Sequence, residues 1–309
     1  MNLSIKGCFF LSFSFVAIEK QVHILLLNSP ERMKHMYNTF VICGDDKRYR
    51  HLAALLVDDE KEVYLWGCSF SCLGCRPICT LYTLTKPVVL VLPFTVQDAE
   101  QIYALKTVPR SSVIVGGPLT PGADEVLQEK ELTYHNLLDD LSYKRDNAIP
   151  TAEGVLALVI GETDRVLRGQ EILLFGYGSV GKDTAKLFSA CGAKVCVASV
   201  SEEELTSAKE SGFDTLKLPL VLNGDKGFLK KFFCCINTIP CSKIVNNEFM
   251  RGFAPTILLV EIASGGDNLD YAAAEDCGIR VLRAMSLPGK IAPRSAAEYI
   301  RNTLYQYLK

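Results

Sequence analysis

The chain has 309 residues and 49% of them are apolar, which is enough for two domains with packed cores. The 33 lysines and arginines against 35 aspartates and glutamates give a net charge of −2, and the sequence contains no basic stripe. The basic surface that nucleic-acid binding requires is therefore not expected. The 12 cysteines are scattered along the chain, and a protein of this size does not need disulfides for stability. We therefore expect a cytoplasmic globular protein that acts on a small molecule.

Residues 1–35 form an N-terminal extension before the first predicted element. An apolar run over residues 8–17 resembles a weak signal peptide, but Glu19 and Lys20 end it well short of the about 20 apolar residues that span a bilayer. A start assigned too early is the alternative, because Met33 and Met36 directly precede the first strand. We expect no membrane association.

Residues 36–147 read as a first domain that is Rossmann-like or flavodoxin-like. Short β-branched runs at residues 39–43, 62–67, 87–93 and 112–115 predict strands, and residues 50–56 predict an amphipathic helix. Alternation of strands and helices is typical of a parallel sheet.

A cysteine cluster follows the second strand. Its members, Cys68, Cys72, Cys75 and Cys79, have a spacing that resembles a metal site, and the first three match an iron–sulfur pattern. The stretch reads as a loop remote from the other motifs, so we interpret these residues as reduced thiols and predict no metal.

Residues 148–309 read as a second domain. Pro150 is expected to end one helix and to open another over residues 151–162. Strands are predicted at residues 171–175, 194–199, 232–237, 257–262 and 280–283, and a last helix at about 293–308. The predicted fold is α/β, with two Rossmann-like parallel-sheet domains facing a cleft and the C-terminal domain binding a dinucleotide.

A glycine loop carries the dinucleotide prediction. It follows the apolar strand 171–175 and opens a helix over 179–191, which is the context that the GxGxxG fingerprint requires. The alternative is a glycine turn that serves packing alone. The candidate cofactor ligands are Gly176, Tyr177, Gly178, Ser179, Val180 and Gly181.

The choice between NAD and NADP depends on the end of the next strand. NAD enzymes place an acidic residue there, about 20 residues after the loop, to hold the ribose 2′-hydroxyl. Here the strand ends in Ser199-Val200-Ser201, and Glu202 follows too late. The hydroxyls of Ser199 and Ser201 suit a 2′-phosphate, which favours NADP and leaves NAD open.

Two further segments are candidates for the site. Thr238 and Pro240 close the strand 232–237, where they would meet the nicotinamide ribose unless they form only a strand-ending turn. Lys290 and Arg294 flank a predicted helix start that suits a carboxylate, with a solvated helix cap as the alternative.

Two carboxylates are candidate proton acceptors, Glu153 and Glu261, and each is equally a candidate surface or capping residue. All four histidines, His23, His35, His51 and His135, lie in the first half of the chain. This argues against a 2-hydroxy-acid dehydrogenase that depends on histidine.

Together these motifs resemble the dipicolinate synthase A family, one of the two components of that synthase, from about Met36 to the C-terminus. The resemblance rests on the segments Val41–Asp45, Asn147–Gly154, Gly176–Gly181, Asn237–Pro240 and Leu287–Pro293, in this order. Two features depart from the family. Gly265-Gly266-Asp267-Asn268 stands where the family carries an arginine, and residues 1–35 have no counterpart.

The resemblance implies an NAD(P)-dependent oxidation of dihydrodipicolinate to dipicolinate during sporulation, together with dipicolinate synthase B, the second component. It implies that Asn147, Thr151, Lys290 and Arg294 bind the dicarboxylate substrate, that Glu153, Lys290 and Glu261 are catalytic, and that the chain forms a homo-oligomer. Two alternatives stay open: an oxidoreductase of the alanine-dehydrogenase or 2-hydroxy-acid-dehydrogenase type, and a non-catalytic nucleotide-binding scaffold protein.

Overall fold

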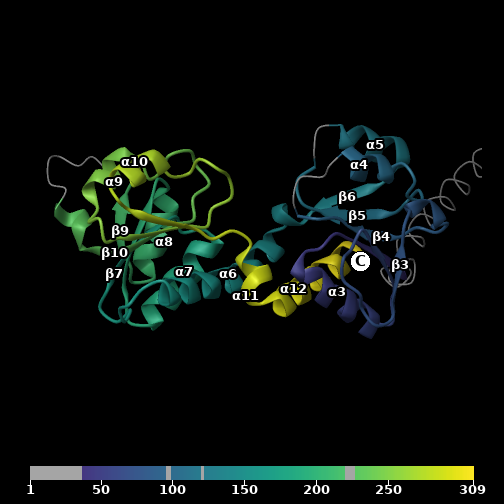
Figure 1. Ribbon diagram of the computed structural model, residues 1–309, viewed down its shortest axis with the longest axis horizontal. Coiled ribbons are helices and arrows are strands. Elements are labelled where there is room, and N and C mark those ends of the chain that lie inside the picture. The colour runs from purple at the N-terminus through teal and green to yellow at the C-terminus, as the bar shows by residue number, and fades with distance from the viewer. Residues whose placement is uncertain (1–36, 95–98, 120–121, 220–226) are drawn as a thin grey trace, which may run out of the picture. The chain divides into compact units, whose positions relative to one another are not determined.

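The computed structural model describes residues 37–94, 99–119, 122–219 and 227–309 (Figure 1). The signal-like run near the N-terminus lies outside these residues. The chain divides into two compact units, one made of the described residues up to Asp140 together with Ala297–Lys309, and the other of Leu141–Ala296. Each unit contains one six-stranded sheet.

The first sheet is parallel throughout. In the order of the sheet its strands are β3 (Cys75–Ile78), β2 (Glu62–Trp66), β1 (Thr39–Cys43), β4 (Val89–Val91), β5 (Val113–Gly116) and β6 (Thr133–Asn136). The connections contain α3 (Lys47–Asp58), η1 (Leu81–Thr83), α4 (Ala99–Leu105) and α5 (Ala123–Lys130), and η2 (Leu137–Asp139) follows β6.

One prediction for this sheet was wrong in part. The cysteine cluster was expected to lie in a loop, and Cys68, Cys72 and Cys79 do lie outside the strands, but Cys75 begins β3, which pairs with β2 along Cys75–Ile78. This strand is short, contains Pro77 and lacks an apolar run. Proline is tolerated in an edge strand, where it removes no hydrogen bond that the sheet needs.

The second sheet is also parallel. Its strands, in the order of the sheet, are β12 (Arg280–Arg283), β11 (Leu258–Glu261), β10 (Phe232–Asn237), β7 (Glu171–Phe175), β8 (Lys194–Ser199) and β9 (Asp214–Lys217). The helices of this unit are α6 (Leu141–Gly161), α7 (Ser179–Ala190), α8 (Glu202–Glu210), η3 (Gly227–Lys231), α9 (Asn247–Gly252), α10 (Tyr271–Asp276) and α11 (Leu287–Ile291).

The strand order reverses between β7 and β10, which is the switch point where open α/β sheets bind their ligands. The predicted fold class, with two parallel sheets of Rossmann type, is thus confirmed. Alternate residues of the central strands point to opposite faces of this sheet and belong to two hydrophobic cores. Leu174 and Ile236 pack with α6, α7 and α8, whereas Phe175 and Cys235 pack with α9 and α10 (Figure 1).

The expected helix break at Pro150 was wrong, because α6 continues through this residue. An internal proline removes one helical hydrogen bond and costs about 3 kcal/mol. Burial of Val155 and Val159 in the core offsets this cost. Packing of α11 against Gly154 adds to the compensation, since a Cβ there would lie 3.0 Å from the Cβ of Leu287. The predicted domain boundary at residues 147/148 therefore falls inside a helix, seven residues after the division at Asp140.

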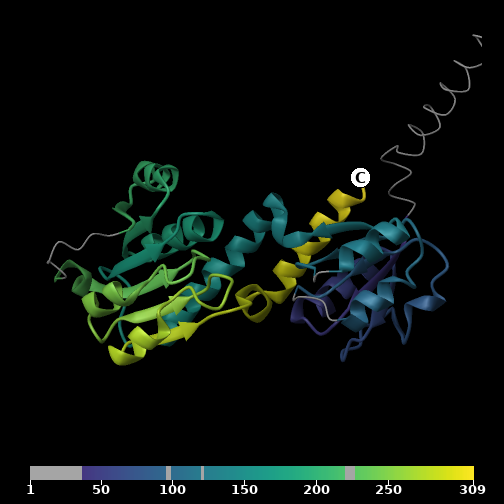
Figure 2. The same ribbon diagram turned by 90° about the horizontal axis from the view of Figure 1, so that it is seen from above.

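The last helix, α12 (Pro293–Tyr307), was expected to belong wholly to the second domain, but residues from Ala297 onwards belong to the first unit. Figure 2 shows its C-terminal part beside the first sheet. The Tyr305 hydroxyl donates to Asp59 at 2.6 Å, and the rings of Tyr305 and Phe40 lie 6.4 Å apart. The Tyr307 ring stacks on His135 at 4.0 Å. Among the described residues, no helix has both the length and the apolar character that a membrane crossing requires.

Candidate functional site

The glycine loop between β7 and α7 is packed too tightly on its inner side for side chains. Gly176 has a φ of +93°, and a Cβ on it would lie 2.4 Å from Oγ1 of Thr238. A Cβ on Gly181 would lie 2.3 Å from the carbonyl oxygen of Gly176. Because neither residue has a Cβ, the first turn of α7 can pack directly on the end of β7. This is the role that the fingerprint assigns to its first and third glycines.

The outer side of the loop is open. Gly178 and Ser179 are exposed, and a Cβ on Gly178 would meet nothing closer than Oε1 of Glu204, at 3.9 Å. No side chain caps α7 at Gly178, so the first backbone N–H groups of this helix can donate to an anion. At Gly178 a ligand can come close to the backbone, and the adjacent N–H groups at the start of α7 are uncapped. This arrangement fits the pyrophosphate of a dinucleotide.

The remaining residues of the loop have inward positions. Tyr177 is buried in the core against α7 and α8, and its backbone N–H donates to Oε2 of Glu204 at 3.0 Å. Val180 is half-buried. Any cofactor contact of these two residues would therefore come from the backbone rather than from the side chains.

Ser199 and Ser201 do not present their hydroxyls as a 2′-phosphate site would need. Ser199 is buried and donates to Oε2 of Glu204 at 2.6 Å. The hydroxyl of Ser201 caps α8 by accepting from the backbone N–H of Glu204 at 3.3 Å. The sequence analysis missed Glu204, which lies half-buried beside the glycine loop.

The segment Asn237–Pro240 leaves β10 next to the loop. The Thr238 hydroxyl donates to the carbonyl of Phe175 at 2.8 Å, which ties this segment to the end of β7. The side chain of Asn237 bonds both the N–H and the carbonyl of Ile239, each at 3.1 Å. Pro240 is exposed. The segment thus forms an organised turn at the rim of the switch point.

Glu261 does not have the exposure that a proton acceptor for substrate requires. Its side chain is fully buried at the end of β11, and its oxygens accept from Asn237 at 3.0 and 3.3 Å and from the N–H of Ala263 at 2.8 Å. Burial raises the pKa of Glu261, although these hydrogen bonds oppose the shift. We therefore assign Glu261 to the fixing of Asn237 and not to proton transfer.

The remaining charged candidates lie near the packing of α6 on α11. Glu153 is exposed and directly precedes Gly154, the residue on which Leu287 packs. Lys290 is exposed in α11, a short helix that the sequence did not predict, and Arg294 is exposed at the start of α12. The hydroxyl of Thr151 donates to the carbonyl of Asn147 at 2.7 Å, so towards a ligand it can act only as an acceptor.

Arg283 is a cation that the sequence analysis did not single out. It is exposed at the carboxyl end of β12, and its guanidinium carbon lies 5.3 Å from the centre of the Tyr271 ring. The ring face holds the guanidinium at this end of the sheet. The sequence already predicted that Arg283 ends a strand, but it gave no sign that Tyr271 lies beside it.

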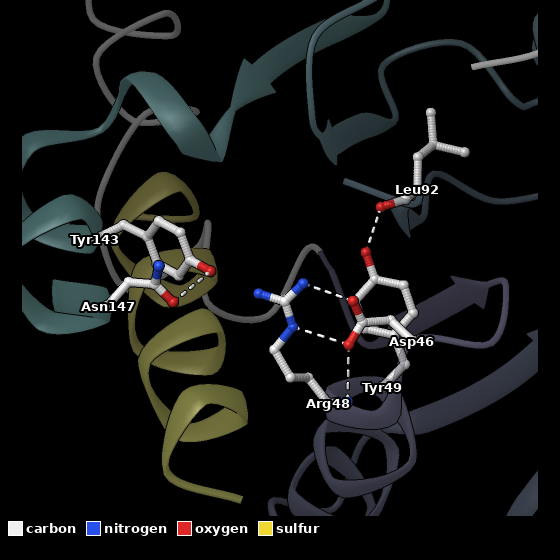
Figure 3. Close-up of polar contacts among 6 residues, drawn as sticks. All are labelled: Asp46, Arg48, Tyr49, Leu92, Tyr143 and Asn147. Atoms are coloured by element: carbon white, nitrogen blue, oxygen red, sulfur yellow. Dashed lines mark hydrogen bonds and ion pairs between the residues drawn. The ribbon is translucent and has the colours of Figure 1, made fainter. Parts of the chain in front are cut away.

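Figure 3 draws two groups of polar contacts, each within one unit. In the first unit the Asp46 carboxylate accepts from Nε of Arg48 at 2.8 Å and from its terminal nitrogen at 2.5 Å. Arg48 is buried and stacks 4.2 Å from the centre of the Phe94 ring. Burial tends to raise the pKa of Asp46, but the hydrogen bonds and charge of Arg48 outweigh it and hold the pKa below its usual value.

Because Asp46 already balances its charge, we do not assign Arg48 to a substrate carboxylate. In the second unit the Tyr143 hydroxyl donates to Oδ1 of Asn147 at 3.3 Å, one turn away on α6 (Figure 3). This contact orients the Asn147 amide.

Two thiols of the cysteine cluster, Cys68 and Cys75, are protonated at neutral pH. Burial is the main cause that raises the pKa of Cys68 to about 11 and that of Cys75 to about 12. Within the described ranges, no three histidine, cysteine or acidic side chains are grouped so that they could hold a metal ion. The expectation of a metal-free protein stays a prediction.

Comparisons with known proteins agree with the motifs. No family model matches the chain. Over 162 residues the chain is 35% identical to the A component of dipicolinate synthase from Bacillus subtilis (strain 168), and the match covers 52% of this chain and 53% of that relative. The matched segment thus spans about half the length of the relative.

Solved structures extend the likeness over most of the chain. The dipicolinate synthase A chain of Bacillus subtilis has a TM-score of 0.76 at 26% identity, covering 87% of this chain and 95% of its own. Its counterpart from Bacillus halodurans has the same TM-score at 23% identity, covering 88% and 98%. The predicted resemblance to dipicolinate synthase A is confirmed. An L-alanine dehydrogenase matches with a TM-score of 0.61 at 14% identity, covering 87% of this chain and 88% of its own, so the fold is shared with dehydrogenases.

Proposed function

We propose that the chain is a nicotinamide-dinucleotide dehydrogenase that oxidises dihydrodipicolinate to dipicolinate. The similarity to dipicolinate synthase A, at 35% identity over 162 residues, carries this proposal. The glycine loop supports it independently, because Gly178 is open to a pyrophosphate while Gly176 and Gly181 close the turn behind it.

The reaction removes one hydride and one proton from a dihydropyridine ring that bears two carboxylates. The nicotinamide, when bound, accepts the hydride. Formation of the aromatic ring supplies much of the driving force. The protein must therefore hold two carboxylates, accept a proton and keep the ring in a fixed orientation.

We assign the carboxylates to cations near the carboxyl end of the second sheet. Lys290 and Arg294 are exposed around the start of α12, and Arg283 is exposed at the end of β12. Arg283 is our candidate for the arginine that is absent from residues 265–268. An arginine fork can bind a carboxylate with two parallel hydrogen bonds, whereas a lysine acts as a point charge.

Glu153 is our candidate for the proton acceptor. It is exposed on α6, beside the contact between Gly154 and Leu287 that fixes α11 and hence Lys290. An exposed carboxylate can act as a general base towards a bound substrate. Asn147, which lies earlier on the same helix, is a candidate hydrogen-bond donor to the substrate, with its orientation set by Tyr143.

The physiological setting follows from the same similarity and forms part of the proposal. The relatives are named as one component of a synthase, so we propose that the chain acts with the second component, dipicolinate synthase B. Formation of dipicolinate during sporulation, a cytoplasmic location and a homo-oligomeric state remain predictions.

The test is an assay of purified chain with its partner protein, freshly prepared dihydrodipicolinate and either NAD or NADP. We expect reduced nicotinamide and dipicolinate to form in equal amounts. If neither product appears with either cofactor, the proposal is wrong.

Substitutions then locate the site. We expect Lys290→Gln and Arg283→Gln each to raise KM at least tenfold, and Glu153→Gln to lower kcat at least tenfold. Lys186→Gln and Glu210→Gln change the same charges at exposed positions of α7 and α8 and should leave both constants within twofold. Full activity of all three site variants would instead favour a scaffold protein that holds the cofactor for its partner.

A further inference from the structure

The carboxyl end of β8 carries an unusual concentration of negative charge. In a Rossmann sheet this end lies beside the adenosine ribose, whose 2′-position distinguishes NAD from NADP. The segment from Ser199 to Glu204 contains three glutamates in the first turn of α8 and no lysine or arginine. The exposed Val200 stands directly after the strand.

Glu204 reaches from α8 to the glycine loop. Its Oε2 accepts from the backbone N–H of Tyr177 at 3.0 Å and from the hydroxyl of Ser199 at 2.6 Å. Both hydrogen bonds go to one oxygen. The other, Oε1, lies 3.9 Å from the Cβ position of Gly178, on the open side of the loop. The carboxylate is therefore fixed through Oε2 and presents Oε1 beside the place where a cofactor would approach.

The position of the Glu204 side chain depends on how the N-terminus of α8 is capped. Ser201-x-x-Glu204 has the pattern of a capping box, in which the glutamate normally reaches back to the N–H of the capping serine. Here the N–H of Ser201 donates to Oγ of Ser199 at 3.0 Å. Because Ser199 satisfies that donor, the Glu204 carboxylate is available to the glycine loop.

Of the two lysines near this rim, one forms an ion pair and the other lies near an aromatic ring. Lys217, which pairs in register with Ser199 on the neighbouring strand β9, forms an ion pair with Glu202. Lys182 lies on α7 with its ammonium 5.6 Å from the centre of the Tyr177 ring. Glu203 and Glu204 remain as unpaired negative charges in the described first turn of α8.

We infer that Glu204 recognises the 2′-hydroxyl of the adenosine ribose and makes this chain selective for NAD(H) over NADP(H). A ribose 2′-hydroxyl can donate to Oε1, as it does to the acidic residue at the strand end of NAD enzymes. A 2′-phosphate at the same place would meet a fixed carboxylate and no unpaired cation from the segment, so it would be repelled. The preference for NADP that the two serine hydroxyls suggested is reversed by this neighbour.

This inference rests on the proposed dinucleotide site, and its test measures binding alone. Titration calorimetry of the full chain with NADH and with NADPH gives the ratio of the two dissociation constants. We expect NADH to bind at least tenfold more tightly. Glu204→Gln keeps an acceptor for the Tyr177 N–H and removes the charge, so we expect it to reduce the ratio at least fivefold.

Glu203→Gln is the matched control, because it removes the same charge from the neighbouring exposed position of α8. It should change the ratio less than twofold. Ser199→Ala keeps the carboxylate but removes one donor that fixes it, and we expect a smaller fall in the ratio. Thermal denaturation checks that each variant is folded, and Ser199→Ala keeps the test open if Glu204→Gln is not.

Equal or tighter binding of NADPH by the unmodified chain would overturn the inference. Equal effects of Glu204→Gln and Glu203→Gln would also overturn it, since only general charge would then be at work. Failure to oxidise dihydrodipicolinate while NADH still binds selectively would overturn the proposed function and leave the inference standing.

Discussion

The substitution Gly181→Ala tests whether the glycine loop has the geometry described. The added Cβ would lie 2.3 Å from the carbonyl oxygen of Gly176, whereas real Cβ contacts stay above 3.0 Å. The two atoms must separate by about 0.7 Å. Because the obstacle is backbone, no side-chain rotation can relieve the contact.

Two opposing effects set the magnitude. Alanine is favoured over glycine inside a helix by about 1 kcal/mol, and Gly181 lies in the first turn of α7. Overpacking against rigid structure costs about 1–3 kcal/mol. We take the upper part of that range and expect a net loss of about 1–2 kcal/mol, which lowers Tm by about 2–8 °C for a unit of this size.

The assay combines thermal denaturation with NADH binding. Displacement of α7 moves the N–H groups that we assign to the pyrophosphate, so we also expect NADH affinity to fall at least tenfold. Gly178→Ala is the control, because its Cβ meets nothing within 3.9 Å and its φ of −69° is open to any residue. It should change the unfolding free energy by less than about 1 kcal/mol yet still weaken NADH binding. A Gly181→Ala variant with unchanged Tm and affinity would refute the described packing.

Two further predictions concern buried hydrogen bonds. Burial raises the pKa of Glu261 above its ordinary value of 4.5, so the unfolding free energy of the unmodified protein should fall as pH rises through the interval above 4.5. Since glutamine does not titrate, Glu261→Gln should gain stability relative to the unmodified protein over that interval, and a pH-independent difference in urea denaturation would contradict this. Tyr305→Phe removes a 2.6 Å hydrogen bond to the Asp59 carboxylate and should cost about 1.5–3 kcal/mol. The exposed Tyr82→Phe should cost almost nothing, and equal losses for both would refute the contact.

The sequence determined the buried strands of both sheets. β1, β7, β8 and β10 occur at the residues where continuous apolar runs predicted them. Strands that are covered on both faces exclude polar residues, so their signal is local and strong. The edge strands β3, β6 and β9 were not predicted. All three are partly exposed, β6 and β9 are mainly polar, and β3 is a short strand that contains a proline.

Continuity of α6 through Pro150 was decided by contacts far along the chain. A local rule ends a helix near proline, and it fails here because Gly154 meets Leu287 and Ile291 from α11. The assignment of most of α12 to the first unit likewise depends on contacts far along the chain, because Tyr305 and Tyr307 have their partners in that unit.

The candidate site divides in the same way. The glycine loop could be read from the sequence because its chemistry lies within six residues that follow one strand. The roles of Ser199, Glu204 and Glu261 could not, because each depends on which side chain the fold places beside it. Hydrogen-bond partners and burial depend on distances between elements. The sequence alone therefore indicated a dinucleotide, whereas the tertiary structure decided which side chains around the loop are buried and which hydrogen bonds they form.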